Sequence, residues 1–202
     1  MSDERRIRLS PDERRAQLVA VGVNYLADHP LDDLTMDELA RRAGVSRPLL
    51  FHYFETRQGM HRAVVTTARD SLLSATEPRA DLAPGARIRD TLTRIVAFVR
   101  GHRGTFFSLV RGVASGDPEV RTIVDESRDL NALRLREAFQ ELGAVDSPVL
   151  RLALRAWVSF AEEVLIEWVV DADVADELVV SFLVRSLRGV VSSADGSATP
   201  AI

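Results

Sequence analysis

The chain has 202 residues, a hydrophobic fraction of 46% and a formal net charge of −4, which fits one large or two small globular domains and excludes a disordered chain. It contains no cysteine, so disulfides, thiolate metal ligands and cysteine nucleophiles are excluded. All 26 basic residues are arginine, and each offers a planar set of donors suited to phosphate or guanine.

The N-terminal residues MSDERRIRLS have no apolar signal core, and no window reaches 18 uninterrupted apolar residues. We therefore expect a cytoplasmic protein without a membrane span. Residues 1–10 are expected to form a flexible arm, in which Arg5 to Arg8 could reach a DNA minor groove or could simply be a solvated chain end.

The first helix is expected to begin at Ser10-Pro11-Asp12-Glu13. This order of residues gives a capping serine, a proline at the first helical position and a glutamate that completes a capping box. The helix should end near Asp28 or His29, because Pro30 follows.

The second and third helices are short. Thr35-Met36-Asp37-Glu38 reads as another capping box, and Gly44 is placed to end the helix in a left-handed conformation. Ser46 is expected to cap the third helix, in which Pro48 is tolerated because it lies in the first turn. Thr56 should cap a fourth helix that ends at about Thr76.

Two short helices joined by the turn Gly44-Val45-Ser46 indicate a helix-turn-helix over about residues 35–54. Leu50 and Phe54 should face the first two helices and leave Arg47, Pro48 and His52 outside. A helical hairpin in an ordinary core would explain the leucines equally well. It explains less well why two capping boxes, a glycine turn and exposed arginines occur together.

The run 35-TMDELARRAGVSRPLLFHYFETRQGM-60 and the preceding 15-RAQLVAVGVNYLADHPLDDLT-35 resemble the DNA-binding signature of the Tet repressor (TetR) family of bacterial regulators. The resemblance covers about residues 11–71. It implies an all-α dimer in which each subunit has an N-terminal three-helix DNA-binding domain and a C-terminal helical ligand-binding and dimerisation domain.

The resemblance also assigns roles to particular residues. It implies that Thr35 and Ser46 bind phosphates at helix N-termini, and that Arg57 takes the place of the family's usual lysine as a further phosphate ligand. Arg47 and His52 are then the expected base contacts. The complete predicted DNA-binding set is Thr35, Ser46, Arg47, Pro48, Phe51, His52, Tyr53 and Arg57.

Three residues depart from the family pattern. Phe51 replaces the usual tyrosine and loses its hydroxyl, and whether Tyr53 replaces that hydroxyl stays open. Pro48 replaces a small residue and disfavours helical geometry at Arg47. Pro30 replaces the usual glycine after the first helix. The first two departures leave the base contacts open.

The C-terminal domain is expected over residues 77–192, with a flexible tail at 193–202. Its helices should span about 84–101, 104–115, 117–142, 147–171 and 174–192, which brings the total to about nine. Aromatic residues could line an apolar effector pocket or could only pack the core. The predicted ligand-binding set is Phe98, Phe106, Phe107, Trp157, Phe160, Glu163 and Trp168.

Along 178-LVVSFLVRSLRGVV-191, nearly all sides of the helix are apolar, so another surface must cover it. By resemblance, helices 147–171 and 174–192 pair with a second copy to form a homodimer, which would read a pseudo-palindromic operator in double-stranded DNA. The expected function is that of a repressor released from DNA by a small apolar effector.

Two other classes of function stay open on the sequence alone. The chain shows none of the common catalytic motifs, so an enzyme is the less favoured class, and no metal or cofactor is expected. A helical interaction module without DNA binding is the other alternative, and a gel-shift experiment would separate it from a repressor.

Overall fold

The computed structural model describes residues 9–111, 117–170 and 174–194, and in these segments it contains α-helices and one short 3₁₀ helix but no strand. The all-α expectation is therefore confirmed. In chain order the helices are α1 (Pro11–Tyr25), η1 (Leu31–Asp33), α2 (Met36–Ala43), α3 (Arg47–Phe54), α4 (Arg57–Ala75), α5 (Pro84–Gly101), α6 (Arg103–Arg111), α7 (Pro118–Glu141), α8 (Pro148–Val170) and α9 (Asp176–Ala194).

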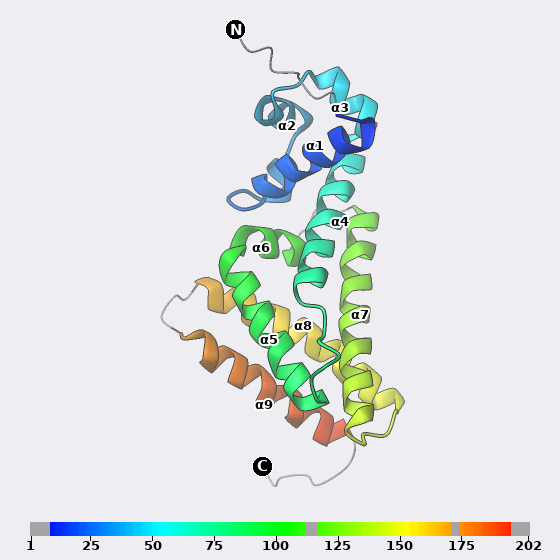
Figure 1. Ribbon diagram of the computed structural model, residues 1–202, viewed down its shortest axis with the longest axis vertical. Helices are drawn as coiled ribbons and strands as arrows, with labels where there is room; N and C mark the ends of the chain where they lie inside the picture. Colours follow the sequence, from blue (N-terminus) through cyan, green and yellow to red (C-terminus); the bar gives the residue numbers. More distant parts are fainter. Residues whose placement is uncertain (1–8, 112–116, 171–173, 195–202) are drawn as a thin grey trace.

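Figure 1 shows two units stacked along the long axis of the molecule. Helices α1 to α3 lie at one end, and α5, α7, α8 and α9 form the body at the other. Helix α4 begins in the first unit and runs down into the second. The predicted arm at Arg5 to Arg8, residues 195–202 of the predicted tail, and the expected helical residues 112–115 and 171 lie outside the described part of the chain. Residues 193 and 194, also predicted to be tail, belong instead to α9.

The first helix starts where the sequence predicts. The amide of Glu13 donates to Oγ of Ser10 at 3.2 Å, and the amide of Ser10 donates to Oε2 of Glu13 at 2.7 Å, so the capping box is complete. The helix ends at Tyr25, three residues earlier than Asp28, and a turn carries the chain to Pro30.

The second capping box is only half formed, which corrects the expectation from the sequence. The amide of Glu38 donates to Oγ1 of Thr35 at 3.1 Å. The carboxylate of Glu38 instead accepts from Arg41 and Arg42 at 2.6 to 2.9 Å. The hydrogen bonds from Arg41 and Arg42 lower the pKa of Glu38 to about 2. The Glu38 carboxylate binds these arginines instead of the Thr35 amide because both arginines lie one turn further along the same helix face.

The N-terminal core is built from residues of α1 to α4 that are almost completely buried. Its largest side chains with less than 2% of their surface exposed are Leu18, Leu26, Leu34, Leu39, Leu50, Met60, Val64 and Val65. His61 is also buried there, and its Nε2 lies 2.7 Å from the carbonyl oxygen of Leu34. Because a carbonyl only accepts, Nε2 carries the hydrogen. Burial lowers the pKa of His61.

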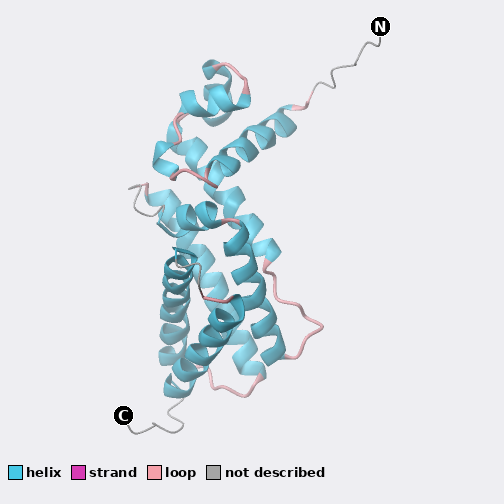
Figure 2. Cartoon of the chain, turned by 90° about the vertical axis from the view of Figure 1, so that its left-hand side faces the viewer, coloured by secondary structure: helices cyan, strands magenta, loops and turns pink. Residues whose placement is uncertain are grey.

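The C-terminal core lies between α5, α7, α8 and α9. Figure 2, turned by 90° from the first view, shows that the described elements of the chain are helices joined by loops. Leu150, Leu154, Leu183 and Leu187 are fully buried at its centre. None of the described helices is long and apolar enough to cross a membrane.

Helix α4 is fixed to α7 as well as to the N-terminal unit. Arg62 contacts Asp117 and Glu119, and Nη1 of Arg69 lies 3.1 Å from Oε2 of Glu126. Val120 of α7 and Leu109 of α6 belong to the same buried cluster as α1 to α4. The two units are therefore joined by shared apolar packing and by ion pairs along α4.

Candidate functional site

The turn between α2 and α3 has the geometry that the sequence predicts. Gly44 adopts φ 65° and ψ 34°, a left-handed conformation that disfavours side chains, and its amide donates to the carbonyl of Ala40. On helix α3, which follows, Leu50 and Phe54 pack in the core, with 0% and 4% of their surface exposed. The outer face of this helix is left to solvent.

The exposed face of α3 contains the residues expected to meet DNA. Arg47, Pro48, Phe51 and His52 are exposed, and Tyr53 is half-buried. The guanidinium of Arg47 lies 5.5 Å from the centre of the Phe51 ring and 3.4 Å from Oδ1 of Asp37. Asp37 and Arg47 are both exposed, so this ion pair is weak and can exchange for a stronger acceptor.

Ser46 takes the capping position of α3, but its side chain accepts no capping hydrogen bond. The cause is Pro48, which has no amide hydrogen at the second helical position, while the amide of Leu49 donates to the carbonyl of Ser46 at 3.1 Å. This departs from the predicted cap. It leaves the hydroxyl of the exposed Ser46 without a capping partner at the start of α3, where it could bind a phosphate oxygen.

Thr35 and Arg57 lie on either side of α3 in the chain, at the beginnings of α2 and α4. Thr35 is exposed while its Oγ1 caps α2. Arg57 is exposed and donates through Nη2 to the carbonyl of Asp32 in η1. Thr56 caps α4 by accepting from the amide of Gly59 at 3.0 Å. Exposed polar residues therefore stand at the starts of α2, α3 and α4, in addition to those on the outer face of α3.

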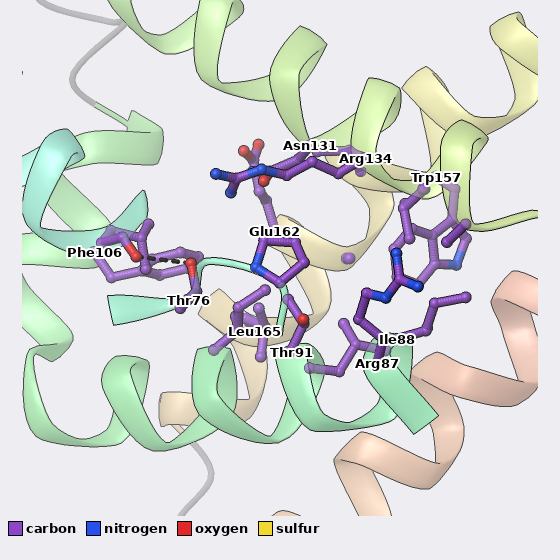
Figure 3. A pocket seen from close by; sticks show the side chains of 18 residues that line it. Thr76, Arg87, Ile88, Thr91, Phe106, Asn131, Arg134, Trp157, Glu162 and Leu165 are labelled. Atoms are coloured by element: carbon purple, nitrogen blue, oxygen red, sulfur yellow. Dashed lines mark hydrogen bonds between the residues drawn. The ribbon is translucent and has the colours of Figure 1, made fainter. Parts of the chain in front are cut away.

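A cavity of about 110 Å³ lies in the C-terminal unit between the end of α4 and helices α5, α7 and α8 (Figure 3). Of the seven residues predicted to bind a ligand, Phe106 and Trp157 line it. Most of the remaining wall is aliphatic, with Ile88, Leu92, Ile95, Leu135, Val158 and Leu165 among the lining residues. Leu72 and Thr76, at the end of α4, complete the wall.

The other five predicted ligand residues lie outside this cavity. Phe98 stacks on His102, and Phe160 packs against Phe182 with a ring separation of 6.0 Å. Nε1 of Trp168 donates to the carbonyl of Val174 at 2.8 Å. Glu163 is exposed and pairs with Arg111 at 2.6 Å. Phe107 is half-exposed and lines a second, more open cavity of about 480 Å³ between the α1–η1 turn, α6 and α8.

The cavity also has polar walls that were not expected from the sequence. Arg87, Thr91, Asn131, Arg134 and Glu162 line it. Glu162 accepts from Nε of Arg128 at 2.7 Å, and burial raises the pKa of Glu162. Helical periodicity could have predicted that Glu162, and not its neighbour Glu163, faces the cavity. The reason is that Trp157, Val158 and Leu165 share the inner face of α8 with Glu162.

The outer surface formed by α8 and α9 carries several large apolar side chains. On α8 and α9 the exposed large side chains are Val149, Leu152, Phe160, Leu178 and Phe182, and Leu152 is 72% exposed. Val149, Leu152 and Phe160 lie on one face of α8, and Leu178 and Phe182 lie one turn apart on α9, so each helix presents an apolar stripe to solvent. A patch of this kind marks an interaction surface. In the described part of the chain, no cluster of histidine and acidic residues could hold a metal ion.

Family models match both units. The model described as bacterial regulatory proteins, tetR family, matches residues 18–64. A second, described as the tetracyclin repressor-like C-terminal domain, matches residues 84–188, which is more than half of the 202 residues.

Curated relatives match part of the chain. EthR of Mycobacterium tuberculosis, an HTH-type transcriptional regulator, is 37% identical over 79 residues, which are 39% of this chain and 33% of EthR. BetI of Cronobacter sakazakii, another such regulator, is 34% identical over 89 residues, 44% of this chain and 43% of BetI. The chain therefore aligns with less than half the length of each.

Solved structures match nearly the whole chain. A tetR-family transcriptional regulator from Streptomyces coelicolor superimposes with a TM-score of 0.79 at 26% identity, over 94% of this chain and 85% of that protein. AibR, solved in complex with isovaleryl coenzyme A and operator DNA, has a TM-score of 0.67 at 17% identity, over 87% of this chain and 98% of its own. The second likeness concerns the fold alone.

Proposed function

Because this chain belongs to the TetR family of bacterial regulatory proteins, we propose that it is a repressor that leaves its operator when a small effector binds in the cavity of the C-terminal unit. It would act in the cytoplasm, where bacterial DNA lies. Regulators rather than enzymes make up the matched family, so the proposal assigns no catalytic residue.

In the proposal, α3 enters the major groove with Arg47 and His52 directed to base edges. Arg47 can donate two hydrogen bonds to the O6 and N7 atoms of a guanine. Ser46, Thr35 and Arg57 would hold phosphates on either side. The exposure of these side chains, and the uncapped hydroxyl of Ser46, support these roles. Pro48, Phe51 and Tyr53 would pack against the sugar–phosphate wall.

The proposed assembly is a two-fold homodimer. The apolar stripes of α8 and α9 would pack against the same stripes of a second copy, forming a four-helix interface. Phe160 and Phe182 would lie inside it. Such a dimer places two copies of α3 side by side, and their separation must match successive major grooves, about 34 Å apart.

A single observation carries the proposed coupling. Helix α4 is one uninterrupted helix that begins at Arg57 and has the cavity-lining residue Leu72 in its last turn. Nineteen residues make it about 28 Å long. A ligand that shifts the cavity end of α4 would therefore move the DNA-binding end too. The strength of this coupling equals the difference in ligand affinity between the DNA-bound and the released conformations.

The test is DNA binding by the full chain. Duplexes enriched from a random pool by binding to the protein would be measured by fluorescence anisotropy at several salt concentrations. We expect Arg47→Ala to weaken binding by about 1–3 kcal/mol per half-site and to relax the preference at one base position. Arg57→Ala should weaken binding to all sequences and reduce the salt dependence by about one ion per contact.

Arg89→Ala is the matched control, because Arg89 is an exposed arginine of α5 whose partner is Glu177, far from α3. It should leave DNA binding unchanged. If the wild-type chain enriches no sequence, or if all three variants bind DNA equally well, the proposal fails and a helical interaction module becomes the better account.

A further inference from the structure

We infer that the effector is a small carboxylic acid with a compact apolar body, and that Arg134 of α7 binds its carboxylate. The inference rests on the proposed function of the cavity and adds the chemistry of the ligand. Three observations on the cavity wall carry it: the balance of charges, the atoms without hydrogen-bond partners, and the size of the apolar space.

The charged side chains of the wall do not balance. Arg87 is neutralised by Glu141, with Nη1 and Nη2 donating to the two carboxylate oxygens at 2.9 and 2.8 Å. Glu162 is neutralised by Arg128 at 2.7 Å. Arg134 has no carboxylate within ion-pairing distance in the described part of the chain. The wall therefore has one uncompensated positive charge.

Two atoms of the wall are buried without a hydrogen-bond partner among the described residues, namely Nη1 of Arg134 and Oγ1 of Thr91. A buried guanidinium nitrogen that donates to nothing destabilises the folded chain, because it has lost water and gained no acceptor. The carboxylate of a ligand would supply both the acceptor and the missing negative charge.

The positions of these groups suit a ligand that has a charged end. Figure 3 shows Arg134 with Asn131 on α7 at one side of the cavity, and Thr91 on α5 across from them. Asn131 and Arg134 are three residues apart, so they share one helix face and could donate to the same carboxylate. The hydroxyl of Thr91 is then left for a second polar atom at the far end of the ligand.

The apolar space limits the body of the ligand. A cavity of about 110 Å³ is close to the roughly 150 Å³ at which an engineered apolar cavity accepts benzene. Phe106, Trp157 and the aliphatic side chains around them would surround a single ring or a short branched chain. Cations are disfavoured, since the two carboxylates near the wall already have arginine partners.

The test compares acids with their neutral amides. Benzoate, cyclohexanecarboxylate and 4-methylpentanoate would be titrated into the full chain beside the corresponding amides, with affinity measured by calorimetry and confirmed by the shift in melting temperature. We expect at least one acid to bind about ten- to a hundredfold more tightly than its amide, the range of a hydrogen bond to a charged group.

Arg134→Gln should reduce the affinity for the acid by the same factor and leave the affinity for the amide unchanged. Arg134→Lys keeps the charge and should restore part of the preference, which also covers the case in which the glutamine variant does not fold. Arg121→Gln is the matched control, an exposed arginine of the same helix that does not line the cavity.

Equal binding of acids and amides would overturn the inference. So would a loss of both in Arg134→Gln, or no response to any acid at millimolar concentration. Operator binding is measured separately on the ligand-free chain. Failure of the acids with DNA binding intact would refute only the ligand chemistry, whereas failure to bind DNA would refute the proposed function itself.

Discussion

Replacing Gly104 by alanine should weaken the junction between the two units. Gly104 is the second residue of α6, and a Cβ atom there would lie 2.1 Å from the carbonyl oxygen of Ala27 and 2.3 Å from that of Leu26. Both neighbours are backbone atoms of the turn that follows α1, so no side chain can rotate away. Relief requires α6 and this turn to separate by about 1.4 Å to reach an ordinary contact distance of about 3.5 Å.

The expected magnitude follows from two opposing effects. Alanine stabilises a helix relative to glycine by about 0.5–1 kcal/mol. Overpacking against a rigid neighbour costs about 1–3 kcal/mol. The difference between these two ranges runs from about 0 to 2.5 kcal/mol, so the free energy of unfolding should fall by about 1 kcal/mol. For a chain of this size, that lowers the melting temperature by about 2–4 °C.

Gly85→Ala is the matched control, because Gly85 is also the second residue of its helix, and a Cβ atom added there would have no neighbour within 4 Å. It should raise stability by about 0.5–1 kcal/mol. Urea unfolding and calorimetry would measure both variants, and anisotropy would measure their DNA affinity. Equal stabilisation of the two variants, with unchanged DNA affinity, would refute the close approach of α6 to α1.

Three further predictions concern other parts of the molecule. Burial lowers the pKa of His61 below its ordinary value of 6.5, so as the pH falls through 6.5 the unfolded chain binds a proton that the folded chain does not. The free energy of unfolding should therefore decrease below pH 6.5. In urea titrations at pH 5 to 8, His61→Gln should remove that part of the decrease. Thr91→Val should raise the melting temperature of the ligand-free chain by removing a buried hydroxyl without a partner, and no gain in differential scanning calorimetry would contradict this. Phe182→Asp should convert the proposed dimer into a folded monomer in sedimentation velocity and reduce DNA affinity, and a persistent dimer would count against the α8–α9 interface.

Local rules predicted most of the helix ends. Ser10, Gly44 and Thr56 each act within a few residues of the chain, so their capping geometry follows from the sequence. The prediction failed where a tertiary or charged partner competed. Glu38 bonds two arginines instead of closing the capping box, and the short helix η1, with no capping side chain, was not predicted at all.

The cavity was harder to predict, because its wall combines residues from several helices. Aromatic content identified Phe106 and Trp157, but aromatic residues also fill cores, and Trp168 and Phe160 lie elsewhere. The sequence does not indicate that Arg134 lines the cavity, because arginines are frequent along α7. Only the packed structure shows which of them lines the cavity without a carboxylate partner among the described residues.

The arrangement of α4 has a consequence for how such proteins diversify. Only the last turns of this helix meet the cavity, and the rest of the wall belongs largely to α5, α6, α7 and α8. Under the proposed function, mutations on those helices would exchange the chemical that is sensed while the operator stays the same. The chain would then serve as a scaffold for biosensors, in which input specificity is evolved separately from a fixed genetic output.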